Sequence, residues 1–488
     1  MAEKSRSAAI RERLHHPIID SDGHIAEFEP ALFDYLRTVA GNQAVERFKA
    51  LPDSPFKFRW YRLTPEERQR HRVPRPHWWV HPTRNTLDRA TSSLPRLLYQ
   101  RLDEMGLDYT IIYPSIGMLA LHLPDDELRG AACRAYNMLH ADLFREYRDR
   151  MTPVALIPMH TPEEALAELD FAIGALRLKS ILMAGWVRRP LAGGPGFWMD
   201  TLCLDSAYDY DPVWRRCVEL KVAPAFHSPS AGFGFRGSIS NFMHNHIGHF
   251  AASAEAICKA MFFGGVTRRF PALRCSFLEG GAGWACGLYA DLVGHWEKHN
   301  REVAQNFNPR HLDEALLERL FKEYGSDYRP EIIAQLGQDR SQLLWGSWEE
   351  NPSDQRDIDE WLQAGIETKA DIRQRFVPHF FFGCEGDDRL TALAFNARLN
   401  PMGARLNAIY SSDLGHFDLP DMRDAAAEAW ELVEHGLISE DDFRDFVFVN
   451  PVRAKTDMNP DFFKGTRVER LVDELLAAPV ADRAALPA

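Results

Sequence analysis

Residues 17–24 read Pro-Ile-Ile-Asp-Ser-Asp-Gly-His, in which two β-branched residues lead into an Asp-x-Asp-x-His run. A strand points every second side chain to the same side, so Asp20, Asp22 and His24 face the same way. Carboxylate and imidazole groups together at the end of a short buried strand are typical metal ligands. This stretch therefore predicts half of a metal site, and the rest of the chain has to supply the other half.

Most of the chain beyond residue 100 alternates between short apolar runs and amphipathic segments of helical period. The runs that we expect to form strands are 17–24, 108–114, 152–158, 179–185, 222–227, 274–279, 379–383 and 407–413. Eight such units favour a parallel sheet that closes on itself, so the predicted fold class is α/β, a (β/α)8 TIM barrel. An open, doubly wound sheet is the alternative. It would need a Gly-rich phosphate turn after its first strand, and Asp22-Gly23-His24 is not one.

We expect a single barrel domain over residues 14–455, two long insertions within it, and a C-terminal extension over 456–488. The insertion at 28–100 follows the first strand and is rich in aromatic residues and Arg. It is open to two interpretations: a lid or wall of a substrate pocket, or an arm that covers a neighbouring subunit. The insertion at 300–375, between strands six and seven, is predicted to be helical and highly charged.

The composition excludes several classes of function. The chain has 488 residues, of which 45% are apolar and 26% charged, as in an ordinary globular protein. A formal charge of −13 leaves no basic surplus to neutralise phosphates, so nucleic acid is not an expected partner. The sequence contains no apolar run of about 18 residues and no secretion signal, so no membrane association is expected. Seven scattered cysteines without a Cys-x-x-Cys spacing fit reduced thiols in a cytoplasmic protein.

Polar residues stand at the carboxyl ends of several predicted strands, where the chemistry of a barrel of this kind is expected. Asp22 and His24 end the first strand, His227 the fifth, Glu279 the sixth and Asp413 the eighth. Two imidazoles and two carboxylates can hold one divalent metal ion, for which Zn, Mn and Fe are all suitable. Such an ion lowers the pKa of a bound water, and a neighbouring carboxylate can take the proton.

Several further residues are candidates for the same site. Glu279 is interpreted as a residue that orients a ligand, with direct ligation and proton transfer as alternatives. His416 lies on the last β/α loop, where it can contact substrate. Among the three histidines of residues 244–249 we expect pocket lining or helix capping, with at most one near the metal, and we assign His246 to substrate binding. Trp186 and Arg188, in the Gly/Pro-rich loop after the fourth strand, are the other predicted substrate-binding residues.

A set of motifs spread along the chain resembles a known family. These motifs are Asp20-x-Asp22-x-His24, His227, Phe277-Leu-Glu-Gly-Gly-Ala-Gly-Trp284, Ser412-Asp413-x-x-His416 and Phe448-Val-Asn450-Pro. Together they resemble the amidohydrolase superfamily, and within it the amidohydrolase-related branch that includes aminocarboxymuconate-semialdehyde decarboxylase. The resemblance covers residues 17–27 and 100–455 and leaves the two insertions unmatched.

The resemblance implies a barrel of the metal-dependent hydrolase type, whose members hydrolyse C–N, C–O or C–C bonds or decarboxylate aromatic acids. It implies that Asp22, which stands where the family has His or Glu, ligates the metal with His24, His227 and Asp413. Decarboxylases of the family generally carry His at the end of the sixth strand, where this chain has Glu279. No bridging Lys follows the fourth strand, which favours a single metal ion.

The leading hypothesis is therefore a metal-dependent hydrolase, in which a metal-activated water attacks a small aromatic or cyclic substrate. Asp413 would act as general base and then proton donor, and Glu279 and His416 would steer the ligands or the substrate. A metal-dependent, non-oxidative decarboxylase is the first alternative, and a barrel that binds a ligand without catalysis is the second. We also expect a homodimer or a larger homo-oligomer. The aromatic residues that suggest a planar substrate are Trp60, Trp78, Trp79, Trp186 and Trp345.

Overall fold

The structure is a computed structural model that describes residues 4–51, 58–77, 84–230, 236–308, 311–335 and 359–478. The chain divides into two compact units. The larger comprises Met1–Tyr289 and Arg375–Ala488, and the smaller comprises Ala290–Gln374. Every candidate site residue belongs to the larger unit. Trp78, Trp79 and Trp345 lie outside the described residues.

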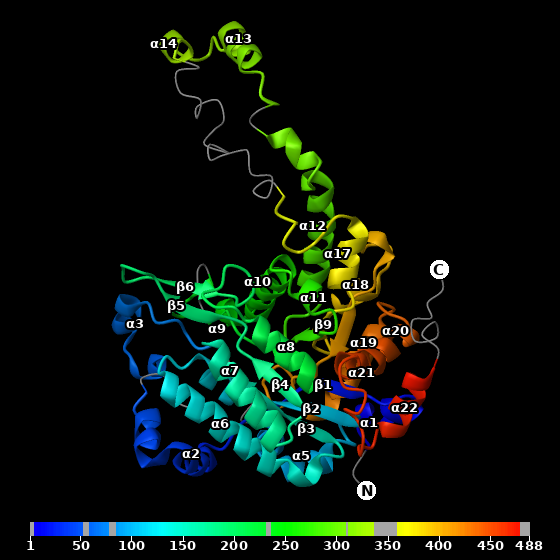
Figure 1. Ribbon diagram of the computed structural model, residues 1–488. Helices are drawn as coiled ribbons and strands as arrows, with labels where there is room; N and C mark the ends of the chain where they lie inside the picture. Colours follow the sequence, from blue (N-terminus) through cyan, green and yellow to red (C-terminus); the bar gives the residue numbers. More distant parts are fainter. Residues whose placement is uncertain are drawn as a thin grey trace. The chain divides into compact units, whose positions relative to one another are not determined.

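Eight parallel strands form the central sheet of the larger unit, in the order β1-β2-β3-β4-β7-β8-β9-β10 (Figure 1). Their bounds are Ile19–Ile25 (β1), Tyr109–Pro114 (β2), Met151–Ile157 (β3), Ser180–Met183 (β4), Pro224–Phe226 (β7), Cys275–Phe277 (β8), Phe380–Cys384 (β9) and Asn407–Tyr410 (β10). The amide of Asp413 donates to the carbonyl of Asp22 (3.1 Å) and the amide of His24 to the carbonyl of Leu414 (2.9 Å). These bonds join the last strand to the first, so the predicted (β/α)8 barrel is confirmed.

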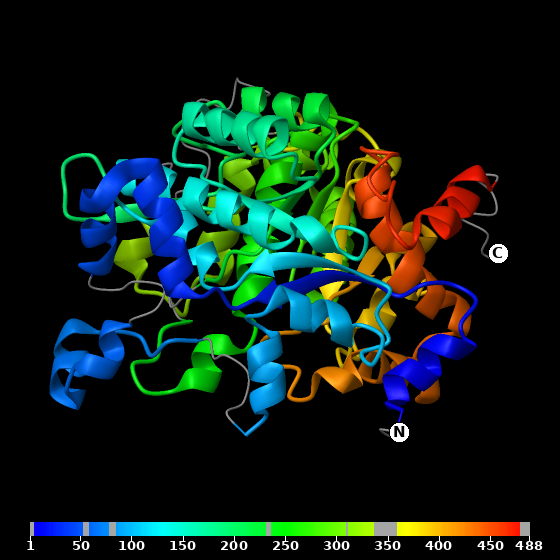
Figure 2. The same cartoon turned by 90° about the horizontal axis from the view of Figure 1, so that it is seen from below.

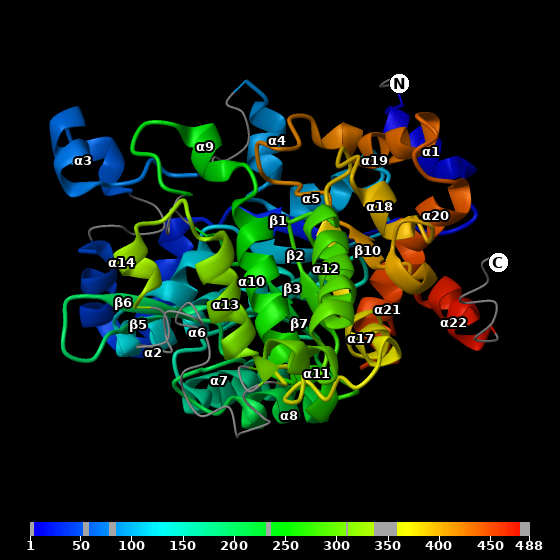
Figure 3. The same cartoon turned by 90° about the horizontal axis from the view of Figure 1, so that it is seen from above.

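Helices surround the strands, as the view from above shows (Figure 3). Those that follow the strands of the barrel are α6 (Asp126–Leu143), α7 (Pro162–Leu169), α8 (Asp211–Leu220), α10 (His249–Phe263), α12 (Gly283–His299), α18 (Thr391–Phe395) and α19 (Ala425–Glu434). Residues of β1, β2 and β3 are buried along their whole length, because the helices cover one side and the barrel interior the other. No described helix is both long enough and apolar enough to span a membrane.

Asp20 fixes the first strand in the barrel interior. Its carboxylate accepts hydrogen bonds from Thr110 Oγ1 (2.6 Å) on β2 and from the amide (2.9 Å) and hydroxyl (2.9 Å) of Ser412 after β10. It also accepts one from the amide of Asp22 (3.1 Å). Asp20 therefore holds the last, first and second strands in register immediately below the candidate metal ligands.

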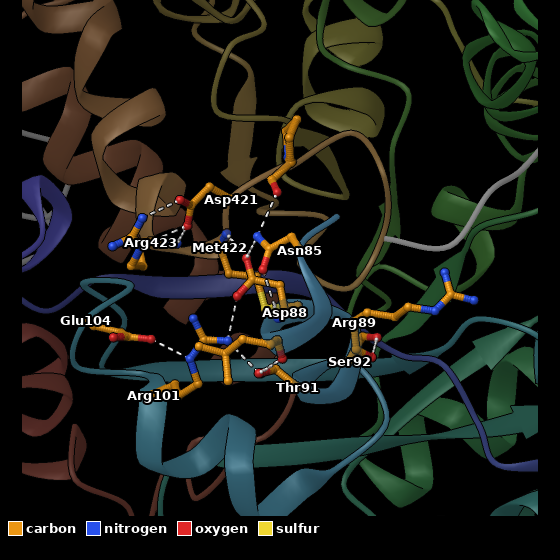
Figure 4. Close-up of polar contacts among 12 residues, drawn as sticks. Asn85, Asp88, Arg89, Thr91, Ser92, Arg101, Glu104, Asp421, Met422 and Arg423 are labelled. Atoms are coloured by element: carbon orange, nitrogen blue, oxygen red, sulfur yellow. Dashed lines mark hydrogen bonds and ion pairs between the residues drawn. The ribbon is translucent and has the colours of Figure 1, made fainter. Parts of the chain in front are cut away.

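The described parts of the segment between β1 and β2 are mainly helical. It contains α2 (Glu29–Lys49), α3 (Pro65–His71), α4 (Thr86–Thr91) and α5 (Pro95–Arg101), and α2 packs along α6 (Figure 2). Figure 4 shows how α4 and α5 are anchored: Asp88 pairs with Arg101 (2.6 Å) and accepts from the amide of Met422 (2.8 Å). The anchor ties this segment to the loop after β10.

A hairpin occupies the segment after β4, where the sequence indicated only a Gly/Pro-rich loop. The strands β5 (Val187–Pro190) and β6 (Phe197–Asp200) pair antiparallel. Gly193 in their turn adopts a φ of +84°, which favours glycine. The guanidinium of Arg189 on β5 pairs with the buried Asp200 on β6 (3.0 Å), and this ion pair ties the two strands of the hairpin together. The four-residue strands are too short for an alternating pattern to be recognised in the sequence.

The smaller unit is helical where it is described. It contains α13 (Glu314–Tyr324) and α14 (Pro330–Ile333), and none of their residues is buried. Asp313 caps α13 by accepting a hydrogen bond from the amide of Leu316 (2.8 Å).

Candidate metal centre

Four side chains from three strand ends converge inside the barrel. Asp22 and His24 come from β1, His227 follows β7 and Asp413 lies three residues beyond β10. His24 Nε2 lies 3.2 Å from Asp413 Oδ1 and 3.4 Å from Asp22 Oδ1. His227 Nε2 lies 3.6 Å from Asp22 Oδ2. The sequence predicted these four residues as metal ligands, and the structure brings them together.

Most polar atoms of this cluster are buried without a hydrogen-bond partner among the described residues. This holds for both carboxylate oxygens of Asp22, for Asp413 Oδ2 and for both ring nitrogens of His24 and His227, whereas Asp413 Oδ1 lies 2.7 Å from His416 Nδ1. Buried polar groups left unpaired are rare in folded proteins because their desolvation is not compensated. The nitrogen and oxygen atoms present are ligands that Zn, Mn and Fe all accept. The cluster therefore fits a divalent metal ion, which would satisfy the unpaired atoms.

Backbone geometry sets two of the site carboxylates apart. Glu279 and Asp413 both have positive φ values, 51° and 49°, a region that residues other than glycine rarely adopt. Each such residue costs roughly 1–3 kcal/mol and persists where the surrounding structure requires it. Both follow the carboxyl end of a barrel strand, β8 and β10, where the left-handed turn directs the chain back across the mouth of the barrel.

Burial shifts the protonation of the cluster in opposite directions for its acids and its imidazoles. It lowers the pKa of His227 to about 4, so this imidazole is neutral and able to ligate a metal near pH 7. It raises the pKa of Asp22 and of Asp413, and the charge of Glu279 raises that of Asp413 further. A bound cation would reverse the shift of the carboxylates, because it favours their charged form.

Glu279 and His416 contact the cluster from two sides. Glu279 Oε2 lies 3.1 Å from His227 Nε2. His416 stacks on the ring of His24 at 4.0 Å, its Nδ1 lies 2.7 Å from Asp413 Oδ1, and its Nε2 lies 2.8 Å from Ser115 Oγ. One ligand atom from each of His24, Glu279, Asp413 and His416 lies within 4.8 Å of the others. Both residues are thus placed to orient the ligands or to exchange protons with Asp413.

A pocket adjoins the cluster at His227. The residues that line it are Phe58, His77, Ser115, Ile116, Met118, Leu119, Leu121, His122, His227, Ser228, Pro229 and Phe250. Most of them are apolar, and the rest are imidazoles and hydroxyls. The segment after β2 contributes Ser115 to His122, and sequence reasoning missed it because its short 3₁₀ helix has no strand or α-helix period.

The three predicted substrate-binding residues lie in different surroundings. Trp186 is buried, stacks on the pocket residue His122 at 4.1 Å, and donates to the carbonyl of Pro229 (3.2 Å). His246 lies next to Asp418, with 3.2 Å between Nε2 and Oδ1. Arg188 is exposed on β5 with its guanidinium over the ring of Phe197, and the structure does not bring it to the cluster.

Sequence reasoning missed three polar residues near the site, Ser115, Glu385 and Asp418. Ser115 directly follows β2 and Glu385 directly follows β9, so the rule that polar residues at strand ends carry the chemistry would have found both. Asp418 lies eight residues beyond β10, and only the return of the loop places it beside His246.

The protein thus has a parallel eight-stranded barrel with buried His and Asp side chains at the strand ends, an arrangement suited to a barrel enzyme that binds a metal ion there. A family model described as amidohydrolase matches residues 77–347, more than half of the chain. The protein belongs to this amidohydrolase family of enzymes, which confirms the resemblance seen in the sequence. A search of curated proteins found no match.

Solved structures share the fold at low sequence identity. An amidohydrolase from Mycobacterium avium subsp. paratuberculosis K-10 is 15% identical with a TM-score of 0.51, covering 90% of this chain and 99% of its own. An IDCase from Metarhizium anisopliae, in apo form, is 12% identical with a TM-score of 0.51, covering 93% and 99%. A dihydroxybenzoic acid decarboxylase from Polaromonas sp. JS666 with bound manganese is 15% identical with a TM-score of 0.47, covering 93% and 99%. At these identities the first two likenesses establish the barrel alone.

Proposed function

We propose that the protein is a metal-dependent, non-oxidative decarboxylase of a small, planar, unsaturated carboxylic acid. The observation that carries this proposal is the predominantly apolar wall of the pocket beside His227. The sequence favoured hydrolysis because Glu279 replaces a strand-end His. The apolar character of the pocket wall, which the sequence did not indicate, supports decarboxylation over hydrolysis.

Apolar surroundings favour decarboxylation for an electrostatic reason. The substrate carboxylate loses its charge as it becomes CO2, so a wall that solvates an anion poorly raises the ground state relative to the transition state. Hydrolysis instead builds negative charge on a carbonyl oxygen, which needs preorganised donors. Among the described residues that line the pocket, the donors are limited to three imidazoles and the hydroxyls of Ser115 and Ser228, and the other seven residues are apolar. This balance supports loss of CO2 over attack by water.

The residues of the cluster have separate roles in this proposal. A divalent cation held by Asp22, His24, His227 and Asp413 would supply the positive charge that binds the substrate carboxylate. Phe250 and the apolar residues after β2 would hold the ring flat against the site. Asp413 would pass to the ring carbon a proton that it receives from His416, 2.7 Å away, while the bond to the carboxyl carbon breaks and CO2 leaves. His416 would recover its proton from solvent, so each turnover consumes one proton.

Hydrolysis stays the second candidate because of one observation. Asp413, His416 and Ser115 form a continuous polar chain, with 2.7 Å from Asp413 Oδ1 to His416 Nδ1 and 2.8 Å from His416 Nε2 to Ser115 Oγ. Such a chain can accept the proton of an attacking water as readily as it can supply one.

Product analysis with the metal-loaded enzyme decides between the candidates. Hydroxylated benzoic acids and related unsaturated acids are tested for CO2 release, and aryl amides, esters and lactones of similar size are tested for hydrolysis. We expect CO2 release, its loss after chelation, and its loss in Asp413→Asn. Hydrolysis without CO2 release would establish the second candidate, and the absence of both reactions in metal-loaded protein would favour a binding barrel.

A further inference from the structure

One buried carboxylate holds the pocket wall after β2 from behind. Glu27, two residues beyond β1, accepts a hydrogen bond from the amide of Ile116 at Oε2 (2.9 Å). It accepts another from the amide of Gly117 at Oε1 (3.2 Å). Gly117 is the first residue of the 3₁₀ helix Gly117–His122. The two oxygens of Glu27 thus hold two consecutive amides at the point where this helix begins.

The segment that Glu27 holds, residues 115–122, forms a large part of the pocket wall. A 3₁₀ helix this short has poor internal hydrogen-bond geometry, so its position depends on contacts from outside. Ser115 at its start also lies 2.8 Å from His416, through Oγ and Nε2. Six of the twelve residues that line the pocket belong to the segment: Ser115, Ile116, Met118, Leu119, Leu121 and His122.

The carboxylate fits closely against the segment. A Cβ added at Gly117 would lie 2.8 Å from Glu27 Oε1, and it would also lie 2.9 Å from Pro114 Cβ and 3.1 Å from the ring of Tyr136. Gly117 is not among the residues with a positive φ, so the close approach is what requires glycine there. Any side chain at this position would push the carboxylate away from the amides.

The charge of Glu27 is stabilised mainly by these amides. Its side chain is fully buried, and no Lys or Arg among the described residues pairs with it. The titratable groups that face it belong to α6: His140 Nε2 lies 3.6 Å from Oε1, and Tyr136 lies beside it. From α2, Glu29 acts electrostatically on the same tyrosine. Burial lowers the pKa of His140 to about 4, so this imidazole is neutral near pH 7.

Protonation of Glu27 would change its partners. Burial raises the pKa of this carboxyl to about 7. A protonated oxygen is a donor and cannot hold an amide as a carboxylate oxygen does. His140 Nε2 has no hydrogen-bond partner among the described residues, so it is the acceptor within reach of a proton on Oε1. The amide of Gly117 would then lose its acceptor.

We propose that Glu27 is a positioning residue, whose ionised carboxylate holds the amides of Ile116 and Gly117 and so sets the pocket wall of residues 115–122. Loss of its charge should loosen this wall. A loosened wall would hold a planar ring less firmly, and that consequence rests on the proposed decarboxylase function. The contact of Glu27 with the wall does not depend on that function.

Hydrogen exchange tests the proposal without a substrate. Deuterium uptake of a peptide with residues 115–123 is measured by mass spectrometry in full-length protein at pH 8 and pH 6, corrected for the intrinsic pH dependence of exchange. At pH 8 we expect the protection of this peptide to fall at least about 10-fold in Glu27→Gln, because an NH2 group replaces one accepting oxygen. Glu29→Gln also removes an acidic side chain from this region and should keep the wild-type protection.

The pH dependence separates the charge of Glu27 from a general effect of acid. The wild type should lose protection of residues 115–123 between pH 8 and pH 6, whereas Glu27→Gln should not. A pH effect that came from the metal ligands would appear in both proteins. Equal losses in both would therefore overturn the proposal, and so would wild-type protection at pH 8 in a folded Glu27→Gln variant. Circular dichroism establishes folding. Glu27→Asp, whose side chain is one methylene too short to reach both amides, serves if Glu27→Gln does not fold.

Steady-state kinetics connects the wall to the proposed function. With an acid that releases CO2, KM should rise about 10-fold in Glu27→Gln at pH 8 while kcat changes less, because the wall holds the ring and Asp413 is held by β1. The outcomes separate the two proposals. Loss of protection in Glu27→Gln without CO2 release by the wild type overturns the decarboxylase alone. CO2 release with wild-type protection in Glu27→Gln overturns the role of Glu27 alone.

Discussion

Asp22 lies fully buried in the barrel, neither of its carboxylate oxygens is hydrogen-bonded to a described residue, and it stands at a position where the resemblance implies His or Glu. The substitution Asp22→Asn removes the carboxylate charge at nearly constant side-chain volume, and so tests whether Asp22 is a metal ligand. We expect the metal affinity to fall at least about 10-fold, because even outer-shell partners of a metal contribute 10–100-fold. Competition with a chromophoric chelator measures the change. Asp387→Asn, at an exposed position, is the matched control, and an unchanged affinity in Asp22→Asn would exclude Asp22 as a ligand.

His379 should make the free energy of unfolding depend on pH in a way that does not involve the metal. Burial lowers its pKa to about 4, and its Nδ1 lies 2.9 Å from the carbonyl of Leu273. Between pH 6.5 and pH 4 the unfolded chain binds a proton at this residue that the folded chain does not, so the free energy of unfolding falls as pH falls.

His379→Asn retains a donor for Leu273 and cannot titrate. We expect the wild type to lose up to about 1.4 kcal/mol per pH unit relative to this variant across that window. Urea unfolding at pH 7 and pH 5 measures both proteins. Parallel pH profiles for wild type and variant would contradict the expectation.

Among the elements, the α4–α5 segment depends on a single buried ion pair, Asp88 with Arg101 (Figure 4). Their side chains are 2% and 8% exposed. Arg101→Met would remove the cation that faces the buried Asp88 carboxylate, which keeps its hydrogen bonds from Met422 and Asn85; removing one partner of a buried ion pair typically costs about 3–5 kcal/mol. The pair of Asp421 and Arg423 in the same region is a natural control, because Arg423 is 55% exposed. Arg423→Met should cost only about 0–1 kcal/mol in urea unfolding. Equal losses of unfolding free energy in Arg101→Met and Arg423→Met would show that burial does not decide how much an ion pair contributes to stability.

All eight barrel strands could be located from the sequence, because each is a short β-branched or aromatic run between clear helix signals. Their carboxyl ends also identified Asp22, His24, His227, Glu279 and Asp413. The hairpin of β5 and β6 and the 3₁₀ helix Gly117–His122 escaped, since elements this short have no period to recognise. The predicted domain bounds at 14–455 and 456–488 stay a prediction.

For the whole molecule, metal binding should be linked to stability, because the ligands come from strands far apart in the sequence. A metal present at about 1,000 times its dissociation constant stabilises a fold by about 4 kcal/mol. Chelation should therefore lower the melting temperature, and re-addition of Zn²⁺, Mn²⁺ or Fe²⁺ in turn should restore it to different extents. Differential scanning fluorimetry measures both, and Asp22→Asn should respond weakly. An unchanged melting temperature of the wild type after chelation would count against the metal site.

The homo-oligomer expected from the sequence stays a prediction, which light scattering can test.

The barrel and the meeting of Asp22, His24, His227 and Asp413 could be predicted from the sequence, because strand patterns are local and parallel strands bring their carboxyl ends to one rim. The family was indicated by the resemblance of its motifs. What surrounds the cluster depends on the tertiary structure. The pocket beside His227 and the meeting of His246 with Glu279 and Asp418 depend on how loops return across the barrel mouth. Loop paths are set by side-chain packing between distant segments, which leaves no periodic trace in the chain.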